Sequence, residues 1–517
     1  MSAPTALLLR AVRIVPVRER SVPGPRATEP LDLLVRGGQV VAVGPDLPTP
    51  PGARVLEGFG RWLVPGLWDQ HVHMTQWGRT AGRLDVSDTS GPHGVLDLVA
   101  AHLRSATTGS GSVVGYGYRS GGWREATSTA ALDAVTGDRP VVLVSGDGHN
   151  GWLNSAAQRF FGVLHREDAF DEDDWFHLWG RLDDLPGSHD EAARGLREAV
   201  DDAASRGVVG IVDMEWGITT TRWAERVADG LDSLRVRPAV YRERLDDAVA
   251  AGLRTGDTVP DTAGLIAMGP LKVISDGSLA TRTAHCHDPY PARSGGEPHG
   301  GGHPLSPYGK QNVDLPELTE LLTVAHRHGL EGAVHTIGDA AAEIALDAFA
   351  ASGAAGSIEH AQLVTRSVAP RMAALHLRAS VQPAHLLDDR DLTTAIWPGR
   401  EDRCFTLRTM LDAGVELALG SDAPVARLDP WLAMAAAVHR ADGDREPWVP
   451  GEQISAAEAL EASVDGAPTV GVGSLADLAL LDSDPLAGDT AAACATTLRT
   501  TRVALTIVGG RVTHDGR

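Results

Sequence analysis

The sequence predicts an α/β protein, namely a (β/α)8, TIM-like barrel with a small sheet domain made from both chain ends and an insertion after the first barrel strand. Three observations predict it. Short apolar segments alternate about eight times with amphipathic, alanine-rich stretches, which is typical of (β/α)8 barrels. Both ends carry β-like runs, and one long segment breaks the alternation. With 517 residues, 43% of them hydrophobic, the chain can bury a large core.

The two chain ends are expected to form strands. Residues 7–17 and 33–43 are rich in valine, leucine and isoleucine, and Gly37-Gly38 breaks the second run as a hairpin turn would. Residues 476–481 and 503–512 repeat this pattern near the other end. The two ends would most simply pair with each other in one composite sheet.

Between the ends, strands and helices are expected to alternate. The eight strand candidates are residues 63–69, 208–214, 236–242, 271–276, 331–336, 357–360, 378–382 and 416–422. The clearest helices are residues 315–328, 339–351, 366–376 and 404–413. The segment at about 74–188 does not fit the alternation, so we expect it to be an insertion over the barrel mouth. This divides the chain into residues 1–62, 63–465 and 466–517.

Composition limits the partners and the location. The formal net charge is −22, which argues against nucleic acid and anionic membranes as partners, because both attract positive surfaces. No apolar run is long enough for a membrane span or a signal-peptide core. Three widely separated cysteines suggest neither disulfides nor a cysteine metal site. We expect a cytoplasmic protein with a small-molecule substrate, and whether it forms a homo-oligomer is left open.

His71 and His73 form the first candidate metal-binding pair. Residues i and i+2 of an extended strand end face the same side, so both imidazoles can reach one ion. About one such pair is expected by chance in a chain with this many histidines, so context must decide. His326 and His328 lie in a helical pattern, where they face apart. The pair at 285 and 287 lies in a loop and is a possible decoy, whereas His71 and His73 directly follow an apolar strand.

Further residues of metal-ligand type end other predicted strands. His335, His360 and Asp422 each terminate an apolar segment, and the carboxyl ends of barrel strands are where barrel active sites assemble. Any one of them alone could equally be a buried, hydrogen-bonded histidine or a helix N-cap. Together with His71 and His73, they place five such residues at the ends of strands one, five, six and eight. A shared metal site explains this better than coincidence.

Lys272 adds a sixth candidate, because it lies inside the apolar segment of the fourth strand. Burying a bare ammonium ion is costly, and a buried salt bridge could use arginine equally well. Lysine occurs only twice among the 46 basic residues, at Lys272 and Lys310. Its presence here therefore indicates chemistry that needs a primary amine. Carbamylation by CO2 would create a carboxylate able to bridge two cations, and a Schiff base is the competing chemistry.

These residues lie in stretches that resemble the amidohydrolase superfamily, in detail its amidohydrolase 3-like subgroup related to N-substituted formamide deformylases. The stretches run in family order and are residues 64–73, 147–149, 272–278, 335–339, 358–362, 420–424 and 475–478. The resemblance covers nearly the whole chain. It implies a barrel with a composite β-sandwich, a binuclear metal centre and hydrolysis. One departure is Asp69-Gln70, where the family has an acidic residue and a serine before the first histidine.

The resemblance also implies roles for individual residues. His71, His73 and Asp422 would hold one ion, His335 and His360 the other, and a carbamate on Lys272 would bridge them. One or two Zn²⁺ ions would lower the pKa of a bound water, so that metal-bound hydroxide attacks a non-peptide, amide-type carbon–nitrogen bond. Asp422 would then carry the proton to the leaving amine.

Other roles and functions stay open at this point. Asp147 and His149 would reach toward the substrate as the resemblance implies, although a simple turn with an Asp cap fits equally well. Asp69, Glu359 and Asp339 are sequence-near partners for ring nitrogens that are not on the metal. The alternative functions are a metal-dependent phosphoester hydrolase and a non-catalytic scaffold on the same fold. A mononuclear deaminase is disfavoured, because Leu363 stands where its glutamate is expected.

Overall fold

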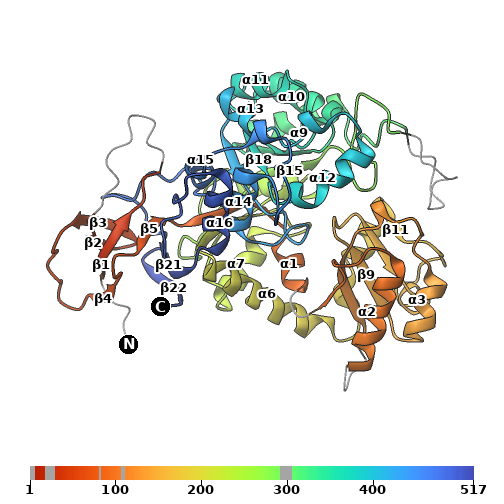
Figure 1. Ribbon diagram of the computed structural model, residues 1–517, viewed down its shortest axis with the longest axis horizontal. Coiled ribbons are helices and arrows are strands. Elements are labelled where there is room, and N and C mark those ends of the chain that lie inside the picture. The colour runs from red at the N-terminus through yellow and green to blue at the C-terminus, as the bar shows by residue number, and fades with distance from the viewer. Residues whose placement is uncertain (1–5, 18–28, 81–82, 106–110, 292–305) are drawn as a thin grey trace.

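The computed structural model describes residues 6–17, 29–80, 83–105, 111–291 and 306–517, and its architecture is mixed α/β, as predicted (Figure 1). A central body of strands and helices lies between two lateral sheets. The sheet built from the chain ends is on the left of Figure 1, and the inserted sheet, in orange, is on the right. Within the described ranges, no helix has both the length and the apolar character needed to cross a membrane.

Strands from both chain ends form one eight-stranded sheet in the order β22-β21-β20-β5-β1-β2-β3, with β4 on β1. The ends meet where β5 pairs antiparallel with β20, which sets Pro65 opposite Leu478. Leu9, Leu33 and Leu505 are fully buried in the apolar cluster of this sheet. The strands are β1 Leu7–Ile14, β2 Leu31–Arg36, β3 Gln39–Gly44, β4 Arg54–Glu57, β5 Trp62–Pro65, β20 Leu478–Leu481, β21 Val503–Val508 and β22 Arg511–Asp515. The division into three domains stays a prediction.

The central strands run parallel in chain order, but they form two sheets and not the closed barrel that the sequence predicts. One sheet has the order β13-β12-β6, and the other runs from β14 to β19 in sequence order. Each predicted barrel strand has a counterpart. They are β6 Leu67–Val72, β12 Val208–Asp213, β13 Arg235–Pro238, β14 Val240–Tyr241, β15 Leu271–Ile274, β16 Gly332–Thr336, β17 Gly356–His360, β18 Arg378–Val381 and β19 Leu417–Leu419.

Backbone hydrogen bonds show why two predicted strands are split. The first predicted strand changes sheets at Gly66, whose N–H donates to Asp477 O in the terminal sheet, whereas Leu67 donates to Gly207 O before β12. A Cβ at Gly66 would lie 2.2 Å from a Val209 methyl carbon, so the crossing needs glycine. The third predicted strand is split in the same way around residue 239. The backbone N–H groups of two successive residues there donate to carbonyl oxygens on opposite sides, one in β12 and one just before β15.

Helices follow the central strands and cover their outer side. Four lie where helices are predicted: α9 Leu315–Arg327, α10 Asp339–Ser352, α11 Val368–Ala374 and α13 Leu407–Asp412. α12, His385–Ile396, is not among the predicted helices. The others are α6 Ser188–Ser205, α7 Thr220–Ala228, α8 Leu245–Ala251, α14 Pro430–His439, α15 Ala456–Glu461 and α16 Ala491–Thr500.

The segment after β6 builds its own five-stranded sheet in the order β11-β10-β9-β8-β7. Trp152 and Trp175 are fully buried in the two apolar clusters of this lobe, so they are core residues. The elements are α1 Met74–Thr80, β7 Leu84–Asp85, α2 Pro92–Ser105, β8 Val113–Tyr118, α3 Thr129–Thr136, β9 Val141–Ser145, β10 Asn150–Leu153, α4 Ser155–Phe161, β11 Phe170–Asp171 and α5 Glu172–Trp179.

Candidate metal centre

Three predicted ligands meet where β6 ends. The Nε2 atoms of His71 and His73 lie 3.5 Å and 3.3 Å from Oδ1 of Asp422. His71 is almost fully buried, and the side chain of His73 is 20% exposed. The strand-end spacing therefore brings both imidazoles to one carboxylate, as predicted for a shared ion.

The backbone around Asp422 is tied directly to β6. The Asp422 N–H donates to His71 O at 2.6 Å, and the Asp69 carboxylate accepts from the N–H groups of His71 and Ser421 at 3.1 Å and 3.0 Å. Asp69 thus organises the backbone of this corner and does not contact a ring nitrogen. Burial raises the pKa of Asp69 to about 6, although these hydrogen bonds act in the opposite direction.

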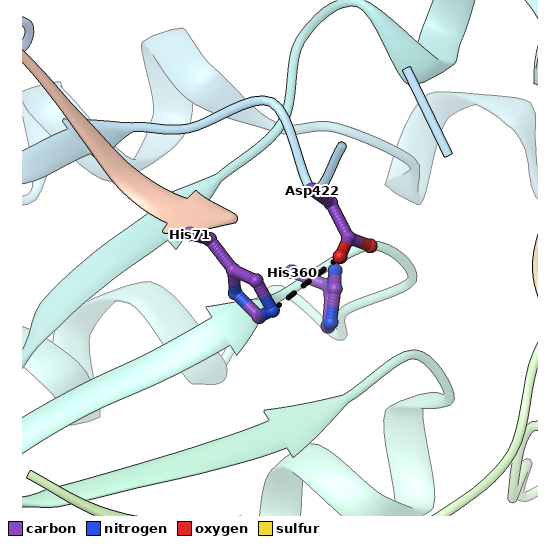
Figure 2. Close-up of side chains that lie close together, drawn as sticks. All are labelled: His71, His360 and Asp422. Carbon is purple, nitrogen blue, oxygen red and sulfur yellow. Dashed lines mark ion pairs between the residues drawn. The ribbon is translucent and has the colours of Figure 1, made fainter. Parts of the chain in front are cut away.

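His360 completes a compact group. One ligand atom from each of His71, His360 and Asp422 lies within 4.8 Å of the others, and all three residues are buried. Figure 2 shows these side chains directed toward one another from separate elements. The backbone φ angles of His360 and Asp422 are +68° and +57°, in the left-handed region that costs energy for residues other than glycine. Such strain is concentrated at functional sites.

His335 and Lys272 border this group. The ring centroids of His335 and His360 are 4.4 Å apart, and His71 lies 4.9 Å from His360 by the same measure. Lys272 is 2% exposed, and its Nζ lies 3.3 Å from His71 Nε2. The structure therefore places His335 and Lys272 beside the group of His71, His360 and Asp422.

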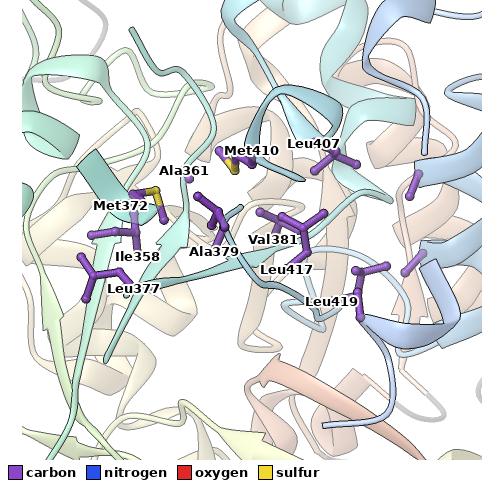
Figure 3. Packing of buried hydrophobic residues seen from close by; sticks show 14 of the residues in the cluster. Ile358, Ala361, Met372, Leu377, Ala379, Val381, Leu407, Met410, Leu417 and Leu419 are labelled. Carbon is purple, nitrogen blue, oxygen red and sulfur yellow. The ribbon is translucent and has the colours of Figure 1, made fainter. Parts of the chain in front are cut away.

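Apolar packing keeps these strands in place. Ile358, Ala379 and Leu419, from three successive strands, belong to a cluster that α11 and α13 complete with Met372 and Met410. Figure 3 shows this packing. A ligand at a strand end is held more rigidly than one on a free loop, because the strand cannot shift without disturbing this core.

Burial and charge keep most of the imidazoles neutral. Burial lowers the pKa of His71 and holds that of His335 and of His360 well below the usual value. For His73 burial acts in the same direction, but the hydrogen bond and charge of Asp422 outweigh it and raise the pKa. Burial also lowers the pKa of the Lys272 ammonium. Neutral imidazole is the form that binds a metal ion.

Two buried carboxylates contact ring nitrogens of the candidate ligand histidines. Glu359 Oε2 lies 2.6 Å from His71 Nδ1, and Asp276 Oδ1 lies 3.4 Å from His335 Nε2. Of the sequence-near candidates, Glu359 therefore contacts a ring, whereas Asp339 contacts Arg403 at 3.2 Å. The sequence analysis did not identify Asp276, although it is a polar residue just beyond an apolar strand and could have been found by the same rule.

The donor set fits a divalent metal ion. Nδ1 of His73 and Nδ1 of His360 are buried, and neither has a hydrogen-bond partner among the described residues. Buried polar atoms without a partner are rare and call for a ligand or an ion. Imidazole nitrogen with carboxylate oxygen is a combination that suits Zn²⁺.

A cavity of about 330 Å³ opens above this group and has His335, His360 and Asp422 in its lining. The inserted lobe contributes Asp147 and His149 to the same lining. Asp147 Oδ1 also accepts hydrogen bonds from Ser145 Oγ and from the His149 N–H, so the turn is present and both residues line the cavity. Whether the two residues bind substrate stays a prediction.

Several known proteins resemble this chain in sequence. The sequence profile described as "Amidohydrolase family" matches residues 59–514. The N-substituted formamide deformylase of Arthrobacter pascens is 26% identical over 93% of this chain and 94% of that protein. Protein LONG AFTER FAR-RED 3 of Arabidopsis thaliana is 27% identical over 87% of this chain and 84% of that protein.

Solved structures also share the fold. An uncharacterized metal-dependent hydrolase from Pyrococcus horikoshii superposes with a TM-score of 0.74 at 20% identity, over 93% of this chain and 98% of that one. A second, from Pyrococcus furiosus, has a TM-score of 0.72 at 22% identity and covers 93% of this chain and all of that one. At these identities the likeness establishes the fold alone.

Proposed function

The chain belongs to the amidohydrolase family, and from this premise we propose that it is a metal-dependent hydrolase that cleaves a non-peptide, amide-type carbon–nitrogen bond. The observation that carries the proposal is the buried group of His71, His360 and Asp422, which lies beside Lys272 at the base of a cavity. The similarity to an N-substituted formamide deformylase supports the amide-type bond.

Membership of the amidohydrolase family supports an assignment of these residues to two ions. His71, His73 and Asp422 would hold one ion and His335 and His360 a second. When bound, divalent ions such as Zn²⁺ supply an activated water and polarise the substrate carbonyl. The Nζ of Lys272 would form an N–C bond with CO2 and lose a proton, and the resulting carbamate would supply two oxygens between the ions.

The chain's own residues would handle the proton and the substrate. A carboxylate oxygen of Asp422 would accept a proton from the attacking water and then deliver that proton to the nitrogen of the leaving amine. Interactions with the imidazoles of His71, His73 and His360, among them the hydrogen bond from His73, outweigh burial and hold the pKa of Asp422 well below its usual value, so the carboxyl group is ionised. Asp147 and His149 would orient the substrate from the inserted lobe.

Metal analysis combined with an activity screen tests this function. The purified protein should carry between about one and two divalent ions per chain, most of them zinc. It should hydrolyse N-acyl amines, formamides or cyclic amides in preference to phosphotriesters. His71→Ala should lose metal and activity, whereas His326→Ala, which changes a helix histidine far from these strand ends, should keep both.

The outcomes separate the alternatives. A dialysed, metal-free protein that keeps its fold and its hydrolytic activity would contradict the proposal. Hydrolysis of phosphotriesters alone would indicate a phosphoester hydrolase, and bound metal without any hydrolysis would favour the scaffold. The cytoplasmic location and the lack of nucleic-acid and membrane partners stay predictions of the acidic composition.

A further inference from the structure

One wall of the cavity above the metal-ligand group is formed by α12, which carries three aspartates. Two of them are already paired. Asp388 accepts from Arg119 at 2.8 Å, and Asp391 accepts from Arg445 at 2.6 Å. Asp389 has no ion pair within the described part of the chain, and it accepts a hydrogen bond from Gln362 Nε2 at 2.9 Å. The wall therefore presents to the cavity one carboxylate that has no ion pair among the described residues.

The environment of Asp389 makes this lack of a partner costly. The residue is half-buried, and burial raises the pKa of its carboxyl to about 6, so it still carries its charge near neutral pH. His385 and Arg119 attract this charge and Asp388 repels it. His385 Nε2 lies 3.2 Å from Ser421 O, and Arg119 is engaged by Asp388, so neither forms an ion pair with Asp389. Because a partly buried charge has lost part of its hydration, an ion pair with a positively charged group of a bound ligand would stabilise it strongly.

Asp389 is closely connected to the metal-ligand group. Its hydrogen-bond donor, Gln362, follows His360 by two residues and lines the same cavity. His360 itself belongs to the lining of this cavity. Leu279, Leu392 and Ile337 add apolar surface to the lining. A ligand could thus span from the metal-ligand group past apolar side chains to a carboxylate.

Resting on the proposed function, we infer that the substrate carries a cationic group on a short apolar arm and that Asp389 is the specificity-determining residue that binds it. The substrate class is an N-acyl or N-formyl amine with a second, protonated amine. The ammonium would donate hydrogen bonds to the Asp389 carboxylate, while the scissile amide lies near Asp422 and the histidines.

A matched pair of ligands tests the inference by calorimetry on the metal-loaded protein. N-(4-aminobutyl)formamide and N-pentylformamide differ in an ammonium against a methyl group of similar size. The wild type should bind the cationic ligand about tenfold more tightly, which is typical of one charge-assisted hydrogen bond in a partly buried site. Asp389→Asn should remove this preference and leave binding of the neutral ligand within about twofold.

Asp391→Asn is the control, because it lies on the same helix but is 72% exposed and already paired with Arg445. It should keep the preference. Equal binding of the two ligands by the wild type, or equal loss in both variants, would overturn the inference. Turnover is scored separately. Selective binding of the cationic ligand without hydrolysis of either formamide would contradict the proposed function and support the cation site. Hydrolysis of both formamides without selective binding would support the proposed function and contradict the cation site.

Discussion

Lys272 shows how a single residue can be interpreted from its surroundings. It is one of two lysines, it is 2% exposed, and its Nζ lies 3.3 Å from His71 Nε2. A lysine that served only as a cation would need a carboxylate partner there. Among the described residues its hydrogen-bond contact is with an imidazole, so a positive charge on Lys272 has no carboxylate in direct contact.

Lys272→Arg should therefore be inactive although it keeps the positive charge, because a guanidinium group has no comparable route to a bridging carbamate. We expect activity to fall by at least about a hundredfold, with loss of bound metal. Lys272→Ala should also lose metal, and a short carboxylic acid in the buffer should restore part of its activity. Lys310→Arg is the matched control and should retain metal. Full activity in Lys272→Arg would exclude the bridge.

Glu359 is the residue that the structure selects as the partner of His71. Glu359→Gln weakens the acceptor at Nδ1, so we expect metal affinity to fall by about 10–100-fold, as for other carboxylates behind ligand histidines. Asp339→Asn, at the rejected sequence-near candidate, should leave metal affinity within about twofold. Competition with a chelator measures both. An unchanged affinity in Glu359→Gln would mean that this contact does not orient the ligand.

At the scale of elements, the inserted lobe is joined to the loop after β15 by polar contacts. Glu172, at the start of α5, lies 3.4 Å from His149 Nδ1 and accepts from Thr283 Oγ1 at 3.0 Å. Ser278 Oγ donates to Asp147 at 3.3 Å. These contacts fix the lobe over the cavity that contains the metal-ligand group.

The His149–Glu172 pair predicts a pH-dependent stability. Burial opposes protonation of His149, but Glu172 raises its pKa to about 9, above the unfolded value of about 6.5. The His149–Glu172 pair therefore contributes its full stabilisation of the folded state below about pH 6.5, and this contribution is lost as the pH rises through 9. Glu172→Gln should cost about 1–3 kcal/mol at pH 6 and much less at pH 9.5, by urea unfolding.

An exposed pair of the same type provides the control. His93 and Glu125 are 3.1 Å apart, but their side chains are 82% and 64% exposed. Glu125→Gln should leave the free energy of unfolding unchanged within error at both pH values, because solvent screens such a pair. A pH-independent loss in Glu172→Gln would indicate that packing, and not the charge on His149, holds the lobe.

At the scale of the whole molecule, the terminal sheet is joined to the central strands through Asp477. Its carboxylate accepts from Arg235 Nε at 2.5 Å and Nη2 at 3.1 Å, and from the Gly509 N–H at 2.6 Å. Arg235 begins β13, whereas Asp477 and Gly509 belong to the C-terminal segment. The ion pair therefore connects the two sheets at a place far from the cavity.

Asp477→Asn should lower the free energy of unfolding by about 3 kcal/mol, because it leaves a largely buried guanidinium without its charge partner. The rate per folded, metal-loaded molecule should not change. Asp482→Asn removes a similar but more exposed partner of Arg61 and should have a much smaller effect. A lower catalytic rate in Asp477→Asn with an unchanged free energy of unfolding would contradict this and show that the Asp477–Arg235 ion pair influences the metal-ligand group.

The histidine and aspartate candidates could be predicted because each lies at the end of an apolar strand segment, whereas Lys272 was noticed because it lies inside one. The rule needs only local sequence, since the carboxyl ends of parallel strands meet at one edge. It could not identify the partner of His71. Asp69, Asp339 and Glu359 all lie within four residues of a candidate ligand in the sequence, but the contact that Glu359 makes is with His71, 288 positions away.

By itself, the sequence determined the mixed α/β class and the residues that gather near the strand ends, because strand periodicity and polar strand ends are local properties. Its stretches of family-like sequence also indicated the family. The tertiary structure alone decided that the central strands form two sheets, that the chain changes sheets at Gly66, and that α12 places Asp389, which has no ion pair among the described residues, in the cavity. Each of these depends on which distant N–H, carbonyl or charge comes within a few ångströms. Such pairings arise only when the whole chain packs, so no local pattern records them.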